Sequence, residues 1–256
     1  MLRKTALLAA MLALGISISG AARAKDFNIT VATGHPPVIP WVRVLRDQFI
    51  PEVNKQLEGS GHKIVWNQAY GSTIVKLGGE LDAIQKGIVD MSIVGATFHP
   101  AKLNLLNVAY YHPFSSLSVE ATVKTVDAMY AKVPEMRKLW ESNNATYLAG
   151  VGVDAFSLFT TKPVHQLSDL KGLKVGGVGP NLNWLRGTGA VGVVVTPNTI
   201  YNDLQAGVYD GLLIAVSQGS SLKLHEVAPY MLKADIQAAY WAGLVINSQT
   251  MKGLPP

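Results

Sequence analysis

The residues that could carry chemistry are few, and histidine and cysteine are the first to consider. The chain has six histidines, at positions 35, 62, 99, 112, 165 and 225, and no cysteine. No two histidines are four residues apart, and none has an acidic partner at metal-ligand spacing, so a zinc site has little support. The sequence also lacks a thiol nucleophile and a Gly-x-Ser-x-Gly motif. We therefore expect neither a metal nor another cofactor.

The acidic residues and one glycine motif leave an enzyme open as an alternative. Glu80, Asp82 and Asp90 could include an acid–base pair, although scattered carboxylates are more often solvated helix faces or caps. The glycines at 187, 189 and 192 match the pattern of dinucleotide-binding loops. That pattern needs a strand before the loop and a helix after it, whereas the order here is reversed. We interpret these glycines as a turn and expect that the protein is not an enzyme.

Aromatic residues and glycines are the remaining candidates for a binding site. Each aromatic residue is more readily explained as core, but several could line a cleft, namely Tyr110, Tyr111, Phe114, Trp184, Tyr240 and Trp241. Glycines also follow several predicted strands, at Gly34, Gly71, Gly95 and Gly176. Each glycine taken singly is explained by a turn. Glycines at the ends of several parallel strands are, however, also what a ligand cleft needs.

The first 24 residues are typical of a secretory signal peptide. Arg3 and Lys4 precede an apolar run over residues 5–18, and Ala22-Arg23-Ala24 fits the small-x-small cleavage rule. An uncleaved membrane anchor is the alternative, which the small and polar residues after the apolar run disfavour. Without the leader's three basic residues the formal net charge falls from +5 to +2, so we expect no nucleic-acid partner. The mature protein is expected in the periplasm.

The elements that must position the candidate residues alternate between strand and helix. We predict strands at Phe27–Ala32, Lys63–Trp66, Val89–Val94, Thr146–Thr161, Lys174–Val175, Val191–Val195, Tyr209–Val216 and Tyr240–Asn247. We predict helices at Pro40–Leu57, Leu77–Lys86, Val119–Trp140, Leu182–Arg186 and Ile200–Ala206. This order predicts an α/β fold of two lobes with mostly parallel sheets. Two of the strands are long enough to cross between the lobes, and the boundary between lobes is where a ligand would bind.

The predicted organisation has four parts. Residues 1–24 are the signal peptide, residues 25–150 form an N-terminal α/β lobe, and residues 151–237 form a second α/β lobe. Residues 238–256 hold the strand that crosses back and a truncated C-terminal segment. The mature length suits two modest lobes better than one.

Four phrases follow one another along the chain: residues 79–91 (GELDAIQKGIVDM), residues 111–114 (YHPF), residues 167–174 (LSDLKGLK) and residues 201–211 (YNDLQAGVYDG). In this order they resemble the DctP-type solute receptors of TRAP (tripartite ATP-independent periplasmic) transporters. The resemblance covers the whole mature chain. It implies the two-lobed periplasmic-binding-protein fold with strands that cross between the lobes. It also implies a monomeric receptor that captures a small organic acid and delivers it to a membrane permease. A receptor of an ATP-driven importer is the closest alternative.

The chain departs from the family at the positions that usually bind the ligand. Family members pair the ligand carboxylate with an arginine on the strand after the LKGLK phrase, because guanidinium suits bidentate pairing. The corresponding residue here is Gly176. Phe156 stands where a second arginine is often found, and Ile214 stands where an asparagine is usual. All three replacements are small or apolar.

These replacements change the expected ligand. A carboxylate cannot be buried against apolar walls without a partner. Lys76, which alignment places at the mouth of the cleft, is the preferred cation, although a surface lysine is the competing interpretation. His35 and the backbone N–H groups of Gly176 and Gly177 are alternative anion contacts. We therefore expect a monocarboxylic acid with a bulky apolar or aromatic part rather than a compact C4-dicarboxylate. The predicted ligand-binding residues are His35, Lys76, Phe98, Phe156, Gly176, Trp184, Ile214 and Trp241.

The resemblance also bears on the end of the sequence. Family members continue past the position of residues 254–256 with several helices that brace both lobes. We expect either a truncated sequence or a shortened receptor, with apolar surface exposed where those helices would pack.

Overall fold

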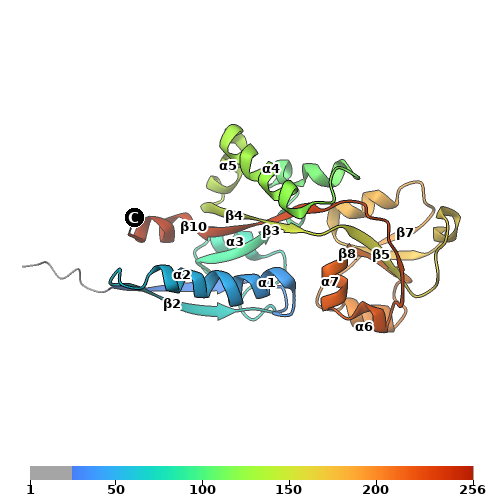
Figure 1. The fold of residues 1–256 in the computed structure, drawn as a ribbon, viewed down its shortest axis with the longest axis horizontal. Helices are drawn as coiled ribbons and strands as arrows, with labels where there is room; N and C mark the ends of the chain where they lie inside the picture. The colour runs from blue at the N-terminus through green and yellow to red at the C-terminus, as the bar shows by residue number, and fades with distance from the viewer. Residues whose placement is uncertain (1–24, 256) are drawn as a thin grey trace, which may run out of the picture.

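The computed structural model describes residues 25–255 and contains two five-stranded sheets, one in each lobe (Figure 1). The predicted signal peptide lies outside the described residues. The first sheet has the order β2-β1-β3-β10-β4 and the second has the order β7-β6-β8-β5-β9. The strands of the first sheet are β1 (Lys25–Ala32), β2 (His62–Ala69), β3 (Met91–Gly95), β4 (Ala145–Val153) and β10 (Ala239–Asn247). The strands of the second sheet are β5 (Phe156–Thr160), β6 (Lys174–Gly177), β7 (Val191–Val194), β8 (Gly211–Ala215) and β9 (Tyr230–Leu232).

Both sheets follow the same directional plan. In the first sheet β10 runs opposite to the other four strands, and in the second sheet β5 runs opposite to the other four. The chain crosses to the second lobe between β4 and β5 and returns between β9 and β10 (Figure 1). Phe156 and residues 236–237 hydrogen-bond to each other where these two crossings meet. The predicted two-lobed α/β fold with mostly parallel sheets and crossing strands is confirmed.

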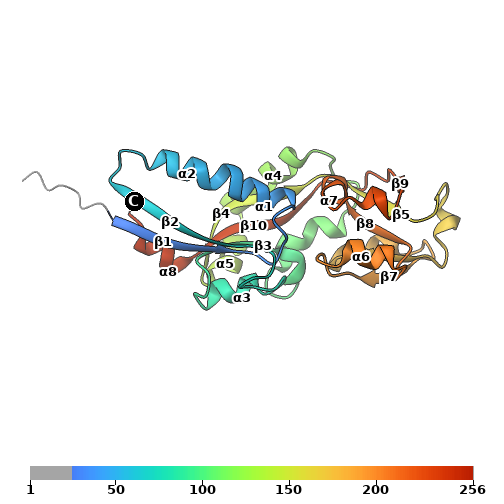
Figure 2. The same ribbon diagram turned by 90° about the horizontal axis from the view of Figure 1, so that it is seen from below.

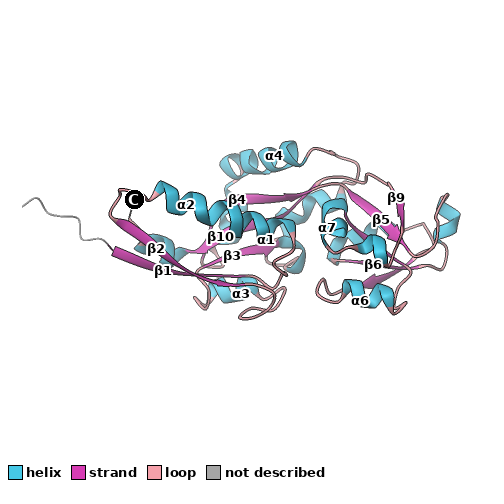
Figure 3. Cartoon of the chain, turned by 60° about the horizontal axis from the view of Figure 1, so that its bottom comes forward, coloured by secondary structure: helices cyan, strands magenta, loops and turns pink. Residues whose placement is uncertain are grey.

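Helices cover the sheet of the first lobe on both faces (Figures 2 and 3). The helices are α1 (Pro40–Val44), α2 (Ile50–Gln56), α3 (Glu80–Gln85), α4 (Val119–Lys132), α5 (Pro134–Glu141), α6 (Ile200–Gln205), α7 (Val216–Ser221) and α8 (Ser248–Gly253). Val42 and Leu45 pack with Ile29 and Ile93 on one face. On the other face α3 and α5 pack with different residues of the same strands. No helix in residues 25–255 is long and apolar enough to cross a membrane.

Prolines and glycines explain where the observed helices differ from the predicted ones. The helix predicted over Pro40–Leu57 contains a π-helical turn, η1 (Leu45–Phe49), between α1 and α2. Pro51 has no N–H, so it cannot donate the hydrogen bond that would continue a regular α-helix at this point. The helix predicted over Val119–Trp140 is divided into α4 and α5 by Pro134. The helix predicted from Leu77 begins only at Glu80, because Gly78 has a left-handed φ of 81°.

Short 3-10 helices make up several of the segments that connect the strands and α-helices. They are η2 (Ala96–Phe98), η3 (Asn104–Tyr111), η4 (Leu167–Leu170), η5 (Gly179–Leu185) and η6 (Leu224–Glu226). The helix predicted at Leu182–Arg186 is therefore a 3-10 turn that begins earlier. The largest core cluster joins the two lobes, because it contains Trp41 and Trp241 of the first and Phe156 and Leu213 of the second.

Candidate ligand-binding site

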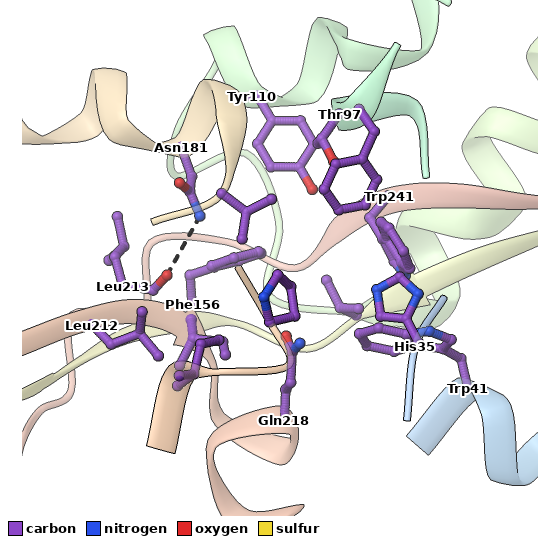
Figure 4. A pocket seen from close by; sticks show the side chains of 16 residues that line it. His35, Trp41, Thr97, Tyr110, Phe156, Asn181, Leu212, Leu213, Gln218 and Trp241 are labelled. Atoms are coloured by element: carbon purple, nitrogen blue, oxygen red, sulfur yellow. Dashed lines mark hydrogen bonds between the residues drawn. The ribbon is translucent and has the colours of Figure 1, made fainter. Parts of the chain in front are cut away.

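A small cavity lies between the two lobes, with a volume of about 40 Å³. Figure 4 shows His35, Trp41 and Trp241 on one side of it and Asn181 and Leu213 on the other. One water molecule needs about 10–15 Å³ by this measure, so the cavity has room for only a few. None of the described residues that line it is Asp, Glu, Lys or Arg. The site can therefore bind a ligand through aromatic surface, amides and an imidazole, but offers it no permanently charged group.

His35 reaches the cavity from the turn that follows β1. Gly71 N–H donates to the His35 carbonyl at 2.9 Å, and the Ser72 hydroxyl donates to the Gly34 carbonyl at 3.1 Å. Gly34 is required here, because a Cβ at this position would lie 2.2 Å from the backbone nitrogen of Leu77. The turn and the 71–77 loop are thus packed backbone to backbone, which fixes where the imidazole points.

Glu80, the first residue of α3, is a buried carboxylate that joins these loops. Its Oε1 accepts from Gly34 N–H at 2.9 Å and from the Thr33 hydroxyl at 3.5 Å, and its Oε2 accepts from Gly78 N–H at 2.7 Å. Burial raises the pKa of Glu80, and these hydrogen bonds oppose that rise. The Thr33 hydroxyl also lies 3.3 Å from Nδ1 of His35. One hydroxyl therefore connects the carboxylate to the imidazole in the cavity.

The imidazole of His35 is packed among aromatic rings. Its centroid lies 5.2 Å from that of Trp41, 5.1 Å from that of Trp241 and 6.2 Å from that of Phe98. This burial lowers the pKa of His35 to about 3, so the ring is neutral at neutral pH. Pairing between β10 and β3 brings Trp241 over Gly95, where a Cβ would lie 2.1 Å from the indole. The aromatic cluster thus depends on a glycine at the end of β3.

A second group of aromatic rings bridges the lobes. Tyr110 stacks on Trp184 with centroids 5.7 Å apart, and Phe156 meets Trp184 edge-on at 5.2 Å. Trp184 Nε1 donates to the Tyr110 carbonyl at 2.8 Å across the boundary between the lobes. Tyr110 and Phe156 line the cavity, and Trp184 packs behind them. This group therefore supports one wall of the cavity.

Three buried polar atoms of the lining residues have no hydrogen-bond partner within residues 25–255. They are the indole Nε1 atoms of Trp41 and Trp241 and the amide Oδ1 of Asn181. The amide nitrogen of Asn181 is 3.4 Å from the Leu213 carbonyl, to which it donates (Figure 4). Indole N–H is only a donor and an amide oxygen only an acceptor. Because unpaired buried polar atoms are uncommon, these are groups that a polar ligand would satisfy.

A larger groove beside α1 is less well suited to bind a polar ligand. Its volume is about 530 Å³, and its walls are mostly apolar side chains such as Val44 and Leu244. Its polar residues are already paired, since the Ser217 hydroxyl donates to Asp154 Oδ1 at 2.5 Å. Residues 25–255 also contain no group of three His, Asp or Glu side chains that could hold a metal ion. The interlobe cavity is therefore the candidate site.

The cavity brings together five of the eight residues predicted from the sequence to bind a ligand: His35, Phe98, Phe156, Ile214 and Trp241. Trp184 lies one layer behind. Lys76 does not line the cavity, and its side chain is exposed. Gly176 does not line it either, because a Cβ there would point into the core, 2.6 Å from Val195 and 2.9 Å from Leu212. The roles proposed for Lys76 and Gly176 therefore stay predictions, and neither residue lines this cavity.

Other aromatic candidates lie elsewhere. Tyr111 and Phe114 are 60% and 72% exposed on the surface, and Tyr240 is in the core of the first lobe against Tyr130. Sequence reasoning missed Trp41, Asn181 and Gln218, which line the cavity. The one feature of the sequence that could have indicated Trp41 is its position shortly after the turn that follows β1. Asn181 and Gln218 had none, because polar residues in short helical segments usually face solvent.

Comparison with known sequences shows a family and a curated relative. The family described as bacterial extracellular solute-binding protein, family 7 (DctP), matches residues 43–256. A solute-binding protein of Albidiferax ferrireducens is 24% identical over 209 residues, which are 78% of this chain. The chain spans 57% of the length of that relative.

Comparison with solved structures gives the same fold. An extracytoplasmic solute receptor of Bordetella pertussis, DctP7, which binds pyroglutamic acid, superposes with a TM-score of 0.75 at 20% identity. The alignment covers 90% of this chain and 73% of that one. A TRAP periplasmic solute-binding protein of Sulfitobacter, with bound β-D-galacturonate, gives a TM-score of 0.73 at 19% identity and covers 89% and 74% of the two chains. At these identities the similarity establishes the two-lobed fold.

Proposed function

The chain belongs to family 7 of the bacterial extracellular solute-binding proteins, and from this membership we propose that it is the receptor of a TRAP-type transporter and binds a small organic acid between its lobes. The observation that carries the proposal is the interlobe cavity, to which both lobes contribute buried aromatic and polar side chains. The ligands of the two similar receptors, pyroglutamic acid and β-D-galacturonate, support an acid as the ligand class.

The ligand we propose is a monocarboxylic acid with an apolar or aromatic part. Phe98, Phe156, Ile214 and Trp241 would contact that part, and Trp184 would hold Phe156 in place. We assign the contact with the ligand carboxylate to His35, the alternative to Lys76, because it is the one basic side chain among the described residues that line the cavity. A second carboxylate would lack any charged partner there, which disfavours a dicarboxylate.

The cavity of about 40 Å³ is too small for the proposed acids, so binding would require the lobes to separate and enlarge it. The two crossings near Phe156 and Ile236 are the connections that both lobes share, so they would form the hinge. The predicted boundary at residue 150 falls inside β4, so we assign residues 25–153 and 239–255 to one lobe and residues 156–232 to the other. The receptor would act in the periplasm as a monomer and deliver its ligand to a membrane permease without chemical change.

A thermal-shift screen followed by calorimetry tests the proposal. Binding to the folded state raises the melting temperature in proportion to the logarithm of ligand concentration. We expect shifts with monocarboxylic acids such as phenylacetate, benzoate or pyroglutamate, and no shift with succinate. Tight binding of succinate without any response to the monocarboxylates would contradict the proposed ligand class.

A further inference from the structure

The cavity poses a problem of charge for an acidic ligand. An organic acid is a carboxylate anion at neutral pH, and its burial without a counter-charge is strongly unfavourable. Lys76 is exposed and Gly176 faces the core, so neither provides that charge. His35 and Tyr110 are the titratable side chains among the described residues that line the cavity. Only the imidazole can become a cation.

The surroundings of His35 are suited to a change of its protonation state. Nδ1 has the Thr33 hydroxyl as its neighbour, and Nε2 has no hydrogen-bond partner within residues 25–255. Of the side chains packed on the ring, Trp41 comes from α1, Phe98 from η2 and Trp241 from β10, and none of them titrates to a charge. Glu80 of α3 is the one charged group connected to the ring, through Thr33.

We infer that the acid binds together with one proton, which His35 takes up on Nε2. This inference rests on the proposed function. The carboxylate enters as an anion, a proton from solvent joins the neutral imidazole, and the bound pair of imidazolium and carboxylate has no net charge; no other bond forms or breaks. Nδ1–H then donates to Thr33, whose hydroxyl donates to Glu80, so the buried carboxylate stabilises the imidazolium through one intervening hydroxyl.

The two indole groups beside His35 fit the same role. Trp41 and Trp241 have ring centroids 4.8 Å apart, and each has a buried N–H without an acceptor. Such donors stabilise a carboxylate without adding charge. A protonated imidazole and two neutral donors would therefore hold the ligand carboxylate in place of a permanently charged guanidinium. Ligand affinity would then depend on pH.

Calorimetry at several pH values tests the inference directly. Phenylacetate and pyroglutamate are titrated into the protein at pH 6, 7 and 8, in two buffers of different ionisation enthalpy at each pH. We expect uptake of about one proton per acid bound and a Kd that rises about tenfold for each pH unit. Phenylacetamide, which has the same ring but no charge, should bind with a Kd that does not change with pH.

Two variants identify the group that takes the proton. His35→Gln keeps a polar side chain of similar size but cannot be protonated, so it should abolish proton uptake and weaken acid binding at pH 6 at least tenfold. Its melting curve shows whether it folds, and phenylacetamide binding shows whether its cavity is intact. His165→Gln changes an exposed histidine and should behave as wild type.

The outcomes separate the two proposals. Binding of an acid without proton uptake, or unchanged acid binding by His35→Gln, would overturn the inference and leave the receptor role intact. Failure of every acid to bind at every pH would overturn the proposed function and the inference together.

Discussion

At the scale of single residues, Gly176 and His35 define the chemistry of the cavity. A side chain at position 176 would have to fit among Val195, Leu212 and Tyr209, which fill the space around it. The glycine is thus part of a packed core and not a binding position that has merely lost its side chain. His35, by contrast, is a buried base whose Nε2 has no hydrogen-bond partner among residues 25–255. Each residue leads to a prediction.

Restoring an arginine at position 176 should destabilise the protein. Its Cβ would lie 2.6 Å from Val195, and overpacking of this kind costs about 1–3 kcal/mol. Urea denaturation of Gly176→Arg should show that loss. Gly253→Arg is the matched control, because no atom lies within 4 Å of a Cβ there, and it should change stability by less than about 0.5 kcal/mol. A Gly176→Arg variant that is as stable as wild type and binds acids more tightly would show that position 176 can still anchor a ligand.

Lowering the pH should destabilise the unliganded protein, because His35 binds a proton more readily in the unfolded chain than in the folded one. The unfolded imidazole binds a proton below about pH 6.5, whereas burial lowers the folded pKa of His35 to about 3. Between these values the unfolded state holds more protons, so the free energy of unfolding falls by about 1.4 kcal/mol for each unit of decreasing pH. Glu80 has the opposite effect on the free energy of unfolding. Burial raises its folded pKa, so the stability that it contributes is lost as the pH increases.

Comparison of wild type with His35→Gln isolates the histidine, since Glu80 is present in both. Urea unfolding from pH 6 to pH 4 should show wild type losing stability faster than the variant. Parallel pH dependence of the two proteins would mean that His35 is already accessible to protons in the folded state.

At the scale of elements, the pairing of β3 with β10 sets the aromatic wall. Ala242 of β10 lies opposite Gly95 of β3, and this register brings Trp241 onto the glycine. Gly95→Ala should therefore displace the indole, destabilise the protein by about 1–3 kcal/mol and weaken acid binding at least tenfold. Thermal melting and calorimetry measure these effects, with Gly253→Ala as the control. Unchanged binding by Gly95→Ala would place the ligand away from Trp241.

The elements also show how far the sequence could be interpreted. The alternation of strands and helices predicted the two lobes, and the long runs around residues 146–161 and 240–247 predicted the crossings. Pro134 and Gly78 altered the helix ends through local backbone restrictions. The site was harder to predict, because several of its residues, such as Phe98 and Asn181, come from short 3-10 segments without periodicity. Trp41 and Asn181 meet in one cavity only after both lobes are assembled.

At the scale of the whole molecule, the binding site belongs to neither lobe alone. The cavity, the Trp184–Tyr110 hydrogen bond and the contact between Asn198 and Ser72 all join residues from both lobes. The two crossings near Phe156 and Ile236 connect the lobes beside this cavity, so a hinge there would open and close the site. Closure would remove water from the imidazole and the indoles, and so strengthen each of their polar contacts with a ligand.

A crystal structure with the tightest-binding acid from the screen tests the central claim most directly, because it locates both the ligand and its carboxyl group. We expect the acid in the cavity between the lobes, with one carboxyl oxygen about 2.6–3.2 Å from Nε2 of His35. An acid bound in the groove beside α1, or one whose carboxylate pairs with Lys76, would contradict it.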